Sequence, residues 1–221
     1  MYWKKECIYG RKTFANISKY IKMATSGNFG NMLSVLIASI FLPFLPLLPI
    51  HILIQNLLND FAQLGMPFDH VDEEYIQKPK KWETKSIKSF MFSLGTISTI
   101  FDVLCFIVLW YILKFNSIEK AAFFQTGWFV FGILSQTLII HMIRTHKIPF
   151  LQSKSSGKLI LSTLVVTLIT LVIGFTKIAS IFDLRQLPTV FSIWLAILII
   201  VYAAMVQIYK TIYVKKNKEW V

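Results

Sequence analysis

The pattern of apolar and polar positions divides the chain into long apolar stretches separated by short polar segments. Between Lys22 and Asp60 lie 37 residues without a formal charge, and prolines interrupt this stretch near its middle. Proline inside a helix removes a backbone hydrogen bond and clashes with the preceding turn, so we expect a helical hairpin that turns through FLPFLPLLP. Each later apolar stretch has the ~20 residues that one helix needs to cross a bilayer. The pattern predicts six spans, at about 23–42, 48–66, 89–113, 121–143, 159–176 and 186–209.

The composition agrees with a membrane protein. Hydrophobic residues make up 55% of the chain and charged residues 15%, and the mean hydropathy is +0.61. A soluble domain carries about 25% charged residues. The two cysteines are too few for a disulfide scaffold or a four-ligand zinc site. We therefore expect an all-α polytopic helix bundle in a bacterial inner or plasma membrane, with lipid as its surroundings. Residues 1–22 are expected to extend the first span as an amphipathic helix, and residues 23–221 to form the transmembrane domain.

The placement of the basic residues along the chain accounts for the formal charge of +12. Of the 23 lysines and arginines, 19 lie before the first span, after the sixth, or in the second-to-third and fourth-to-fifth connections. Basic residues are retained on the cytoplasmic side of a membrane. Both termini are therefore predicted to be cytoplasmic. The basicity reflects topology, and no nucleic-acid partner is expected.

Polar residues inside the spans are the candidates for function, because they are costly in lipid. Four of them share one helical face of the second span, at i, i+3, i+4 and i+7: Asn56, Asn59, Asp60 and Gln63. In the first span Asn28 and Asn31 are three residues apart, and the two faces of a hairpin can converge. Amide and carboxylate oxygens suit a hard cation such as Mg²⁺ or Ca²⁺. The alternative is that these amides only bond neighbouring helices together.

Other residues give simpler interpretations. We find no phosphate-binding loop, H-E-x-x-H pair or nucleophile elbow in the sequence, so no catalytic residue and no ATP site are expected. Asp102 in the third span is interpreted as a buried structural partner. The acidic run is interpreted as a solvated loop; its members are Asp69, Asp72, Glu73 and Glu74.

Two longer segments resemble a known family. YGRKTFANISKYIKMATSGNFGNMLSV and LPFLPLLPIHILIQNLLND are similar to the fifth and sixth transmembrane helices of P-type cation-transporting ATPases. In that family N-L-x-x-D in the sixth helix lines the transport site, and it matches Asn56 and Asp60. The motif G-R-x-x-x-x-N-x-x-K of the fifth helix matches Gly10, Arg11, Asn16 and Lys19.

Two later segments of the sequence resemble the magnesium-transporting branch of this family. The strings are PFDHVDEEYIQKPKKW and SQTLIIHMIRTHKIPFLQS, and the likeness covers roughly residues 10–215. It implies that Mg²⁺ is the transported ion. The implied ligands are Asn28, Asn31, Asn56 and Asp60, with Gln136 in the fourth span as a further candidate. The calcium pumps have glutamate where this chain has Asn31, which argues against calcium.

The resemblance concerns only the membrane half of such a pump. The family phosphorylates an aspartate in D-K-T-G-T and binds ATP in domains that precede the fifth helix, and these 221 residues contain no such motif. The chain is thus expected to form the ion pathway, with the N-terminal catalytic half of the pump as a possible partner. In these pumps the loop after the sixth helix also touches the phosphorylation domain. The alternatives are a non-functional truncated fragment, a passive cation carrier, or a regulatory membrane subunit.

Overall fold

The computed structural model describes residues 2–77 and 84–217, and over these residues the chain is helical with no β-strand. The expected all-α fold is confirmed. The long helices are α1 (Tyr2–Phe41), α2 (Pro49–Gln63), α4 (Thr84–Ile107), α5 (Ala121–Ile143), α6 (Gly157–Phe175) and α7 (Val190–Asn217). The short helical segments are η1 (Met66–Phe68), α3 (Glu73–Ile76), the π-helical η2 (Val108–Ile112), η3 (Ile118–Lys120) and η4 (Lys177–Phe182).

The predicted hairpin between the first two apolar segments is confirmed. Helix α1 ends at Phe41, and Pro43 and Pro46 lie in the irregular connection that follows. Pro49 is the first residue of α2. Proline is tolerated there because the first turn of a helix has no internal acceptor for its missing N–H. The prolines therefore end one helix and begin the next.

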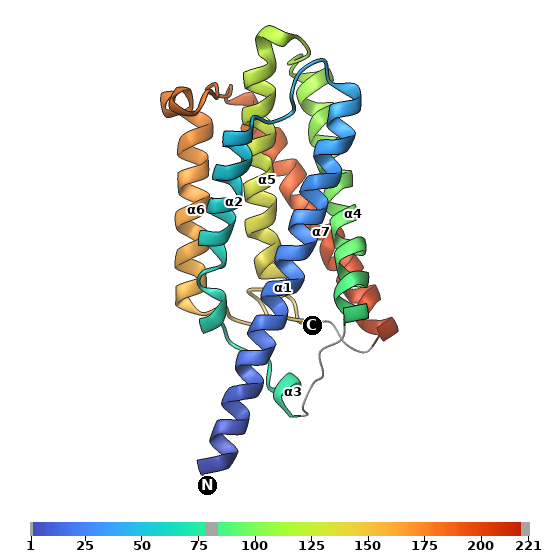
Figure 1. Cartoon of the computed structure of the whole chain (residues 1–221), viewed down its shortest axis with the longest axis vertical. Coiled ribbons are helices and arrows are strands. Elements are labelled where there is room, and N and C mark those ends of the chain that lie inside the picture. Colours follow the sequence, from blue (N-terminus) through green and yellow to red (C-terminus); the bar gives the residue numbers. More distant parts are fainter. Residues whose placement is uncertain (1, 78–83, 218–221) are drawn as a thin grey trace.

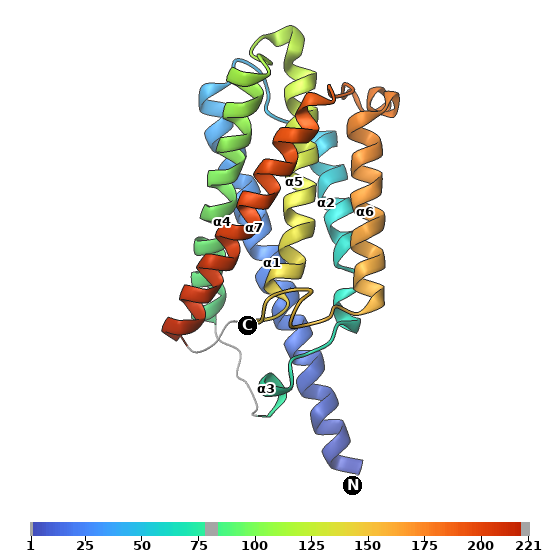
Figure 2. The same cartoon turned by 180° about the vertical axis from the view of Figure 1, so that it is seen from behind.

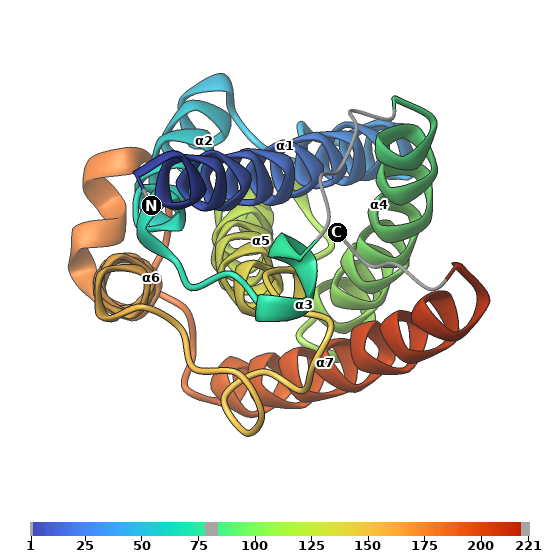
Figure 3. The same ribbon diagram turned by 90° about the horizontal axis from the view of Figure 1, so that it is seen from below.

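The six long helices run side by side, and α5 lies in the middle of the bundle (Figure 1 and Figure 3). Helix α5 is apolar on all faces, and 83% of its candidate span is buried within the protein. A helix that is hydrophobic all round is surrounded by lipid or by other elements, and here the neighbouring helices surround it. The beginning of α1, the segment after α2 and the α5–α6 connection lie at one end of the bundle (Figure 2). The turns α1–α2, α4–α5 and α6–α7 lie at the other end (Figure 1).

Four of the described helical segments are long and apolar enough to cross a bilayer: Thr84–Ile112, Ile118–Ile143, Gly157–Phe175 and Val190–Lys215. Helix α2 has 15 residues, fewer than the ~20 of a full crossing. Helix α1 begins with a long polar stretch before its apolar part. The membrane character of the bundle therefore rests on α4, α5, α6 and α7.

Glycines allow the closest approaches between helices. A Cβ atom on Gly95 of α4 would lie 2.5 Å from Cδ1 of Phe29 and 3.2 Å from the carbonyl oxygen of Ser26, both on α1. A Cβ on Gly65, just after α2, would lie 2.4 Å from Cα of Leu159 at the start of α6. Small residues let backbones pack in this way in membrane bundles. They hold α1 against α4 and the end of α2 against α6.

Candidate cation site

The polar row on α1 turns from the surface of the bundle into its interior. Three residues advance a helix by about 300°, so a row at three-residue steps rotates by about 60° at each step. Accordingly Asn28 is exposed, Asn31 is half-buried and Ser34 is fully buried. The hairpin therefore presents the two asparagines, but not Ser34, at the surface beside α2.

Helix α2 has two different polar faces. Its buried face consists of His51, Gln55, Leu58, Asn59 and Ala62. Asn56 and Asp60 are exposed, on the neighbouring face. The two faces adjoin because adjacent residues differ by about 100° around a helix. One face packs against the rest of the bundle, and the other carries the two residues that match N-L-x-x-D.

Gln136 of α5 joins both helices of the hairpin. Its Nε2 donates a hydrogen bond to Oδ1 of Asn31 at 2.7 Å, and its Oε1 accepts one from Nδ2 of Asn59. Three helices thus meet through three amides. Oδ1 of Asn59 is buried and has no hydrogen-bond partner among the described residues. The three amides therefore leave one buried acceptor unused.

A groove of about 380 Å³ lies in front of these amides. Four amide side chains line it, and we call it the amide groove: Asn28, Asn31, Gln55 and Asn56. Apolar side chains form the rest of its wall: Met32, Val35, Leu47, Ile52 and Trp128. The structure thus brings together three of the five predicted ligands, and Gln136 lies directly behind Asn31.

Asp60 lies on a separate groove. This second groove, of about 470 Å³, is lined by Asp60, Gln63, Asn16, Thr13, Ile17, Tyr20, Leu64, Met66 and Pro67. Asp60 is one helical turn from Asn56 but does not line the amide groove. Oε1 of Gln63 is buried without a partner among the described residues. In this conformation the predicted carboxylate and the predicted amides face different spaces.

Asp102 lies inside the bundle, behind the amide groove. It is 2% exposed, accepts a hydrogen bond from Oγ of Ser34 at 2.5 Å, and accepts another from Nε1 of Trp128 at 3.1 Å. The expected burial of Asp102 and its pairing with neighbouring side chains are confirmed. Since the same Trp128 side chain lines the amide groove, Asp102 fixes one wall of that groove.

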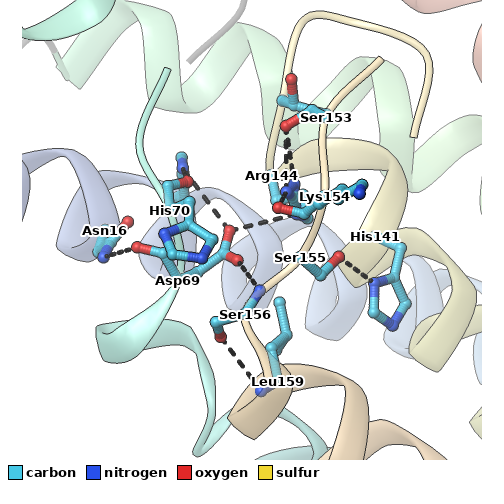
Figure 4. Close-up of polar contacts among 12 residues, drawn as sticks. Asn16, Asp69, His70, His141, Arg144, Ser153, Lys154, Ser155, Ser156 and Leu159 are labelled. Atoms are coloured by element: carbon cyan, nitrogen blue, oxygen red, sulfur yellow. Dashed lines mark hydrogen bonds and ion pairs between the residues drawn. The ribbon is translucent and has the colours of Figure 1, made fainter. Parts of the chain in front are cut away.

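A cluster of charged and polar groups lies at the end of the bundle where the α5–α6 connection meets the segment after α2 (Figure 4). Asp69 is at its centre, and its carboxylate is fully buried. Oδ2 of Asp69 lies 3.2 Å from Nε of Arg144, and Oδ1 accepts a hydrogen bond from the backbone N–H of Ser156 at 3.0 Å. Nδ2 of Asn16 donates to the carbonyl oxygen of Asp69 at 3.1 Å. We call these residues, with Lys19, the Asp69 cluster.

Lys19 and Arg144 complete the cluster. Nζ of Lys19 lies 4.0 Å from Oδ2 of Asp69. Burial lowers the pKa of the Lys19 ammonium from 10.5 to about 8, although the nearby Asp69 acts in the opposite direction. Arg144 also donates to the carbonyl oxygen of Lys154 at 2.6 Å and to Oγ of Ser153 at 3.1 Å. The cluster thus ties α1, the segment after α2 and the α5–α6 connection together.

The interpretation of the acidic run as a solvated loop is wrong for Asp69. Its carboxylate is buried, because two cations and a backbone N–H take the place of water around it. Asp72 is partly exposed, and its carboxylate accepts a hydrogen bond from Oγ1 of Thr145 at 2.8 Å and lies 3.2 Å from Nδ1 of His146. The acidic run therefore attaches the segment after α2 to the α5–α6 connection.

The donor chemistry of the amide groove fits an oxygen-liganded cation. The described residues contain no group of three His, Cys, Asp or Glu side chains placed to hold a metal ion. Neutral amide oxygens alone favour hard cations and bind them weakly, because affinity rises with the number of charged ligands. The groove can therefore hold a hydrated cation through amides, and a carboxylate would have to join it for tight binding.

The sequence comparisons identify the family. The family described as "Cation transporting ATPase, C-terminus" matches residues 44–212 of the chain. The chain belongs to this family. It is 47% identical over 209 residues to "Magnesium-transporting ATPase, P-type 1" of Escherichia coli (strain K12), a match that covers 95% of this chain and 23% of the relative. It is 44% identical over 213 residues to the protein of the same name in Salmonella typhimurium, which covers 96% of this chain and 24% of the relative.

The chain therefore corresponds to the C-terminal part of a cation-transporting ATPase and spans about a quarter of the length of these relatives. Two further amides of α2 take part in this arrangement besides the predicted ligands. Gln55 lines the amide groove, and Asn59 holds Gln136. Asn59 lies on the polar face that the sequence does reveal. Gln55 was not singled out from the sequence, although the polar residues His51 and Asn59 lie one turn before and after it on the same face.

Proposed function

We propose that the chain is the membrane half of a magnesium-transporting P-type ATPase and that it forms the pathway for the ion. The observation that carries this proposal is the amide groove, where Asn28 and Asn31 of α1 meet Asn56 of α2. Gln136 supports the groove from α5 by its hydrogen bond to Asn31. Oxygen-only lining is the chemistry that Mg²⁺ prefers, and Mg²⁺ usually keeps several waters in protein sites.

Asp60 is the proposed charged ligand of this pathway. It is one turn from Asn56 on the exposed side of α2, but it faces the second groove. A rotation or tilt of α2 relative to α1 would bring the carboxylate toward the amides. In a complete pump, phosphorylation would supply such a movement and would switch access between the two sides of the membrane. The two grooves are then two stages of one pathway.

The proposed topology has six crossings, with α1 and α2 added to the four apolar helices, and both termini in the cytoplasm. Its support is the bias of Lys and Arg toward one set of connections. A reporter fused after Lys154 should be active on the cytoplasmic side, and one fused after Asn116 on the outer side. The reverse pattern would place the Asp69 cluster outside and would refute the proposed topology.

The proposed partner is the N-terminal catalytic half of the same kind of pump. The 221 residues contain no D-K-T-G-T motif, so the proposed ATP chemistry lies outside these residues. The relatives' names refer to magnesium, and the match covers 23% of the relative's length. A non-functional fragment and a passive carrier make different predictions in the experiment below.

The proposal is tested in a chimaera that carries the family's catalytic domains in front of Gly10. The chimaera should restore growth of a magnesium-transport mutant on low magnesium. Asp60→Asn should abolish this rescue, because α2 then has no charged ligand, and Asn56→Ala should impair it. Gln63→Ala is the control on the same helix and should have a smaller effect, since Gln63 does not line the amide groove.

The comparison of variants separates the proposed roles. Full rescue by Asp60→Asn, at equal protein level in the membrane, would show that Asp60 is structural. Rescue by the 221-residue chain without the catalytic domains would favour a passive carrier. No rescue by either protein, despite normal membrane insertion, would favour a non-functional fragment.

A further inference from the structure

Gln55 is an unusual residue in the amide groove, because it is buried and unpaired at the same time. Only 3% of its surface is exposed. Its amide makes no hydrogen bond with the described residues. Neither Oε1 nor Nε2 is completely covered by other atoms, so both keep a little exposed surface. Gln55 also lines the amide groove. The little surface that it exposes is therefore at the amide, which faces the groove.

Gly132 of α5 determines where this amide lies. A Cβ atom on Gly132 would be 2.7 Å from Nε2 of Gln55, which is too close for any real contact. Gly132 is one helical turn from Gln136, and Gln55 is one turn from Asn59, which bonds to Gln136. The α2–α5 contact thus repeats at two levels. At the first level Asn59 of α2 bonds to Gln136 of α5. At the second level Gln55 of α2 faces Gly132 of α5, which has no side chain to bond with it.

An unpaired amide in a buried position is costly, and proteins retain such groups where a ligand satisfies them. Gln55 has no described partner, although nearby Asn31 and Asn59 both share one with Gln136. Water can satisfy the amide in the absence of a ligand, since the groove is wide enough to admit it. The same oxygen is then available to replace one water of a hydrated cation.

We infer that Gln55 supplies a further oxygen ligand to a divalent cation in the amide groove, and that Gly132 keeps this amide directed into the groove. The inference rests on the proposed function and adds a residue to the site. Gln55 lies on the inner wall, opposite the open side on which Asn28 and Asn56 are exposed. A cation held between them is contacted from two sides of the groove.

The test measures Mn²⁺ binding to the purified 221-residue chain in nanodiscs of zwitterionic lipid by electron paramagnetic resonance, with Mg²⁺ as the competitor. Mn²⁺ suits the same oxygen ligands. Gln55→Ala should weaken binding about fivefold, the usual effect of losing one such contact. Gln55→Glu places a carboxylate at the same position and should tighten binding about tenfold, because charged ligands raise affinity. A folding defect cannot tighten binding, so this variant separates coordination from stability.

Gly132→Ala should weaken Mn²⁺ binding as much as Gln55→Ala, and the double variant should be no weaker than either single variant. The matched control is Gly127→Ala on the same helix. There an added Cβ would lie 2.4 Å from Cδ2 of Leu109, so it crowds the packing without touching the groove. Gln186→Glu, on an exposed connection, controls for the added charge.

The outcomes are distinguishable. If Asn31→Ala and Asn56→Ala weaken Mn²⁺ binding while Gln55→Ala and Gln55→Glu leave it unchanged, the inference is overturned and the proposed groove stands. If the unmodified chain binds no Mn²⁺ that Mg²⁺ displaces, both are overturned. Equal tightening by Gln55→Glu and Gln186→Glu would also overturn the inference, because the effect would then come from charge alone.

Discussion

The amide groove and the Asp69 cluster are both polar regions of a largely apolar bundle, but they treat their polar atoms differently. In the Asp69 cluster the buried carboxylate has two cations and a backbone N–H around it. The side chains that line the amide groove are neutral, and the Gln55 amide and the Oδ1 atom of Asn59 make no hydrogen bond with the described residues. Paired charges hold elements together, whereas unpaired amides leave capacity for a ligand.

The two regions are linked by the elements that carry them. Helix α1 supplies Asn16 and Lys19 to the Asp69 cluster and Asn31 to the amide groove. Helix α5 carries Gln136, and Arg144 is the residue that follows its end. Helices α1 and α5 therefore connect the Asp69 cluster with the amides.

The comparison predicts that the largest loss of stability comes from the Asp69 cluster. Asp69→Asn leaves Arg144 and Lys19 buried without a counter-charge, which costs about 3–5 kcal/mol in comparable buried pairs. SDS-induced unfolding of the purified chain in mixed micelles measures this loss. Asp72→Asn is the control, because its carboxylate is partly exposed, and it should cost about 1 kcal/mol or less. Equal losses in the two variants would show that burial of Asp69 has no special importance.

A smaller loss is expected behind the amide groove. Gln136→Met keeps the volume of the side chain but leaves Asn31 and Asn59 without their shared partner. An unsatisfied buried group costs about 1–3 kcal/mol. The same unfolding assay measures this variant against Gln186→Met, in which an exposed glutamine is replaced and little change is expected. A cost for Gln136→Met above that of Asp69→Asn would reverse the comparison between the two regions.

Much of the fold could be predicted from the sequence, because long apolar stretches and proline positions are local signals. The turn at Pro43, Pro46 and Pro49 is an example. The continuity of α1 over 40 residues was expected in part, from the amphipathic spacing of its beginning. The near-complete burial of α5 was not predicted, because a uniformly apolar helix does not reveal whether lipid or protein surrounds it.

The candidate site could be predicted only as far as helical periodicity reaches. The positions of Asn28, Asn31 and Asn56 on the two helices of a hairpin predicted that they would lie close together, and they line one groove. The pairing of Gln136 with Asn31 depends on packing between helices distant in the sequence. The burial of Asp69 depends on Arg144, which is also distant in the sequence. Without that partner, an acidic residue in a polar run is expected to be solvated. Pairing of this kind leaves no trace in periodicity.

The smallest loss of stability at neutral pH is expected at Lys19, and this residue sharpens the comparison through its pH dependence. Burial lowers the pKa of Lys19 from 10.5 to about 8 in the folded chain. Between about pH 8 and 10.5 the unfolded chain therefore binds more protons at this residue than the folded chain, so this group makes stability rise with pH in that range. Below pH 8 the ammonium is charged in both states and its burial is unfavourable, offset in part by Asp69.

Lys19→Met should cause no loss of stability near pH 7, because the lowered pKa means that burying the charged ammonium costs more than its pairing with Asp69 returns. The informative measurement is the difference in unfolding free energy between the unmodified chain and this variant, followed from pH 7 to 10.5 at constant ionic strength. The unmodified chain should gain stability relative to the variant as the pH rises. Other lysines and the tyrosines titrate equally in both proteins, so the difference isolates Lys19. A difference that does not change with pH would mean that Lys19 remains hydrated in the folded chain. A difference that falls with pH would mean that the ion pair with Asp69 outweighs the cost of burial. The attraction within the Asp69 cluster would then be stronger than the lowered pKa of Lys19 implies.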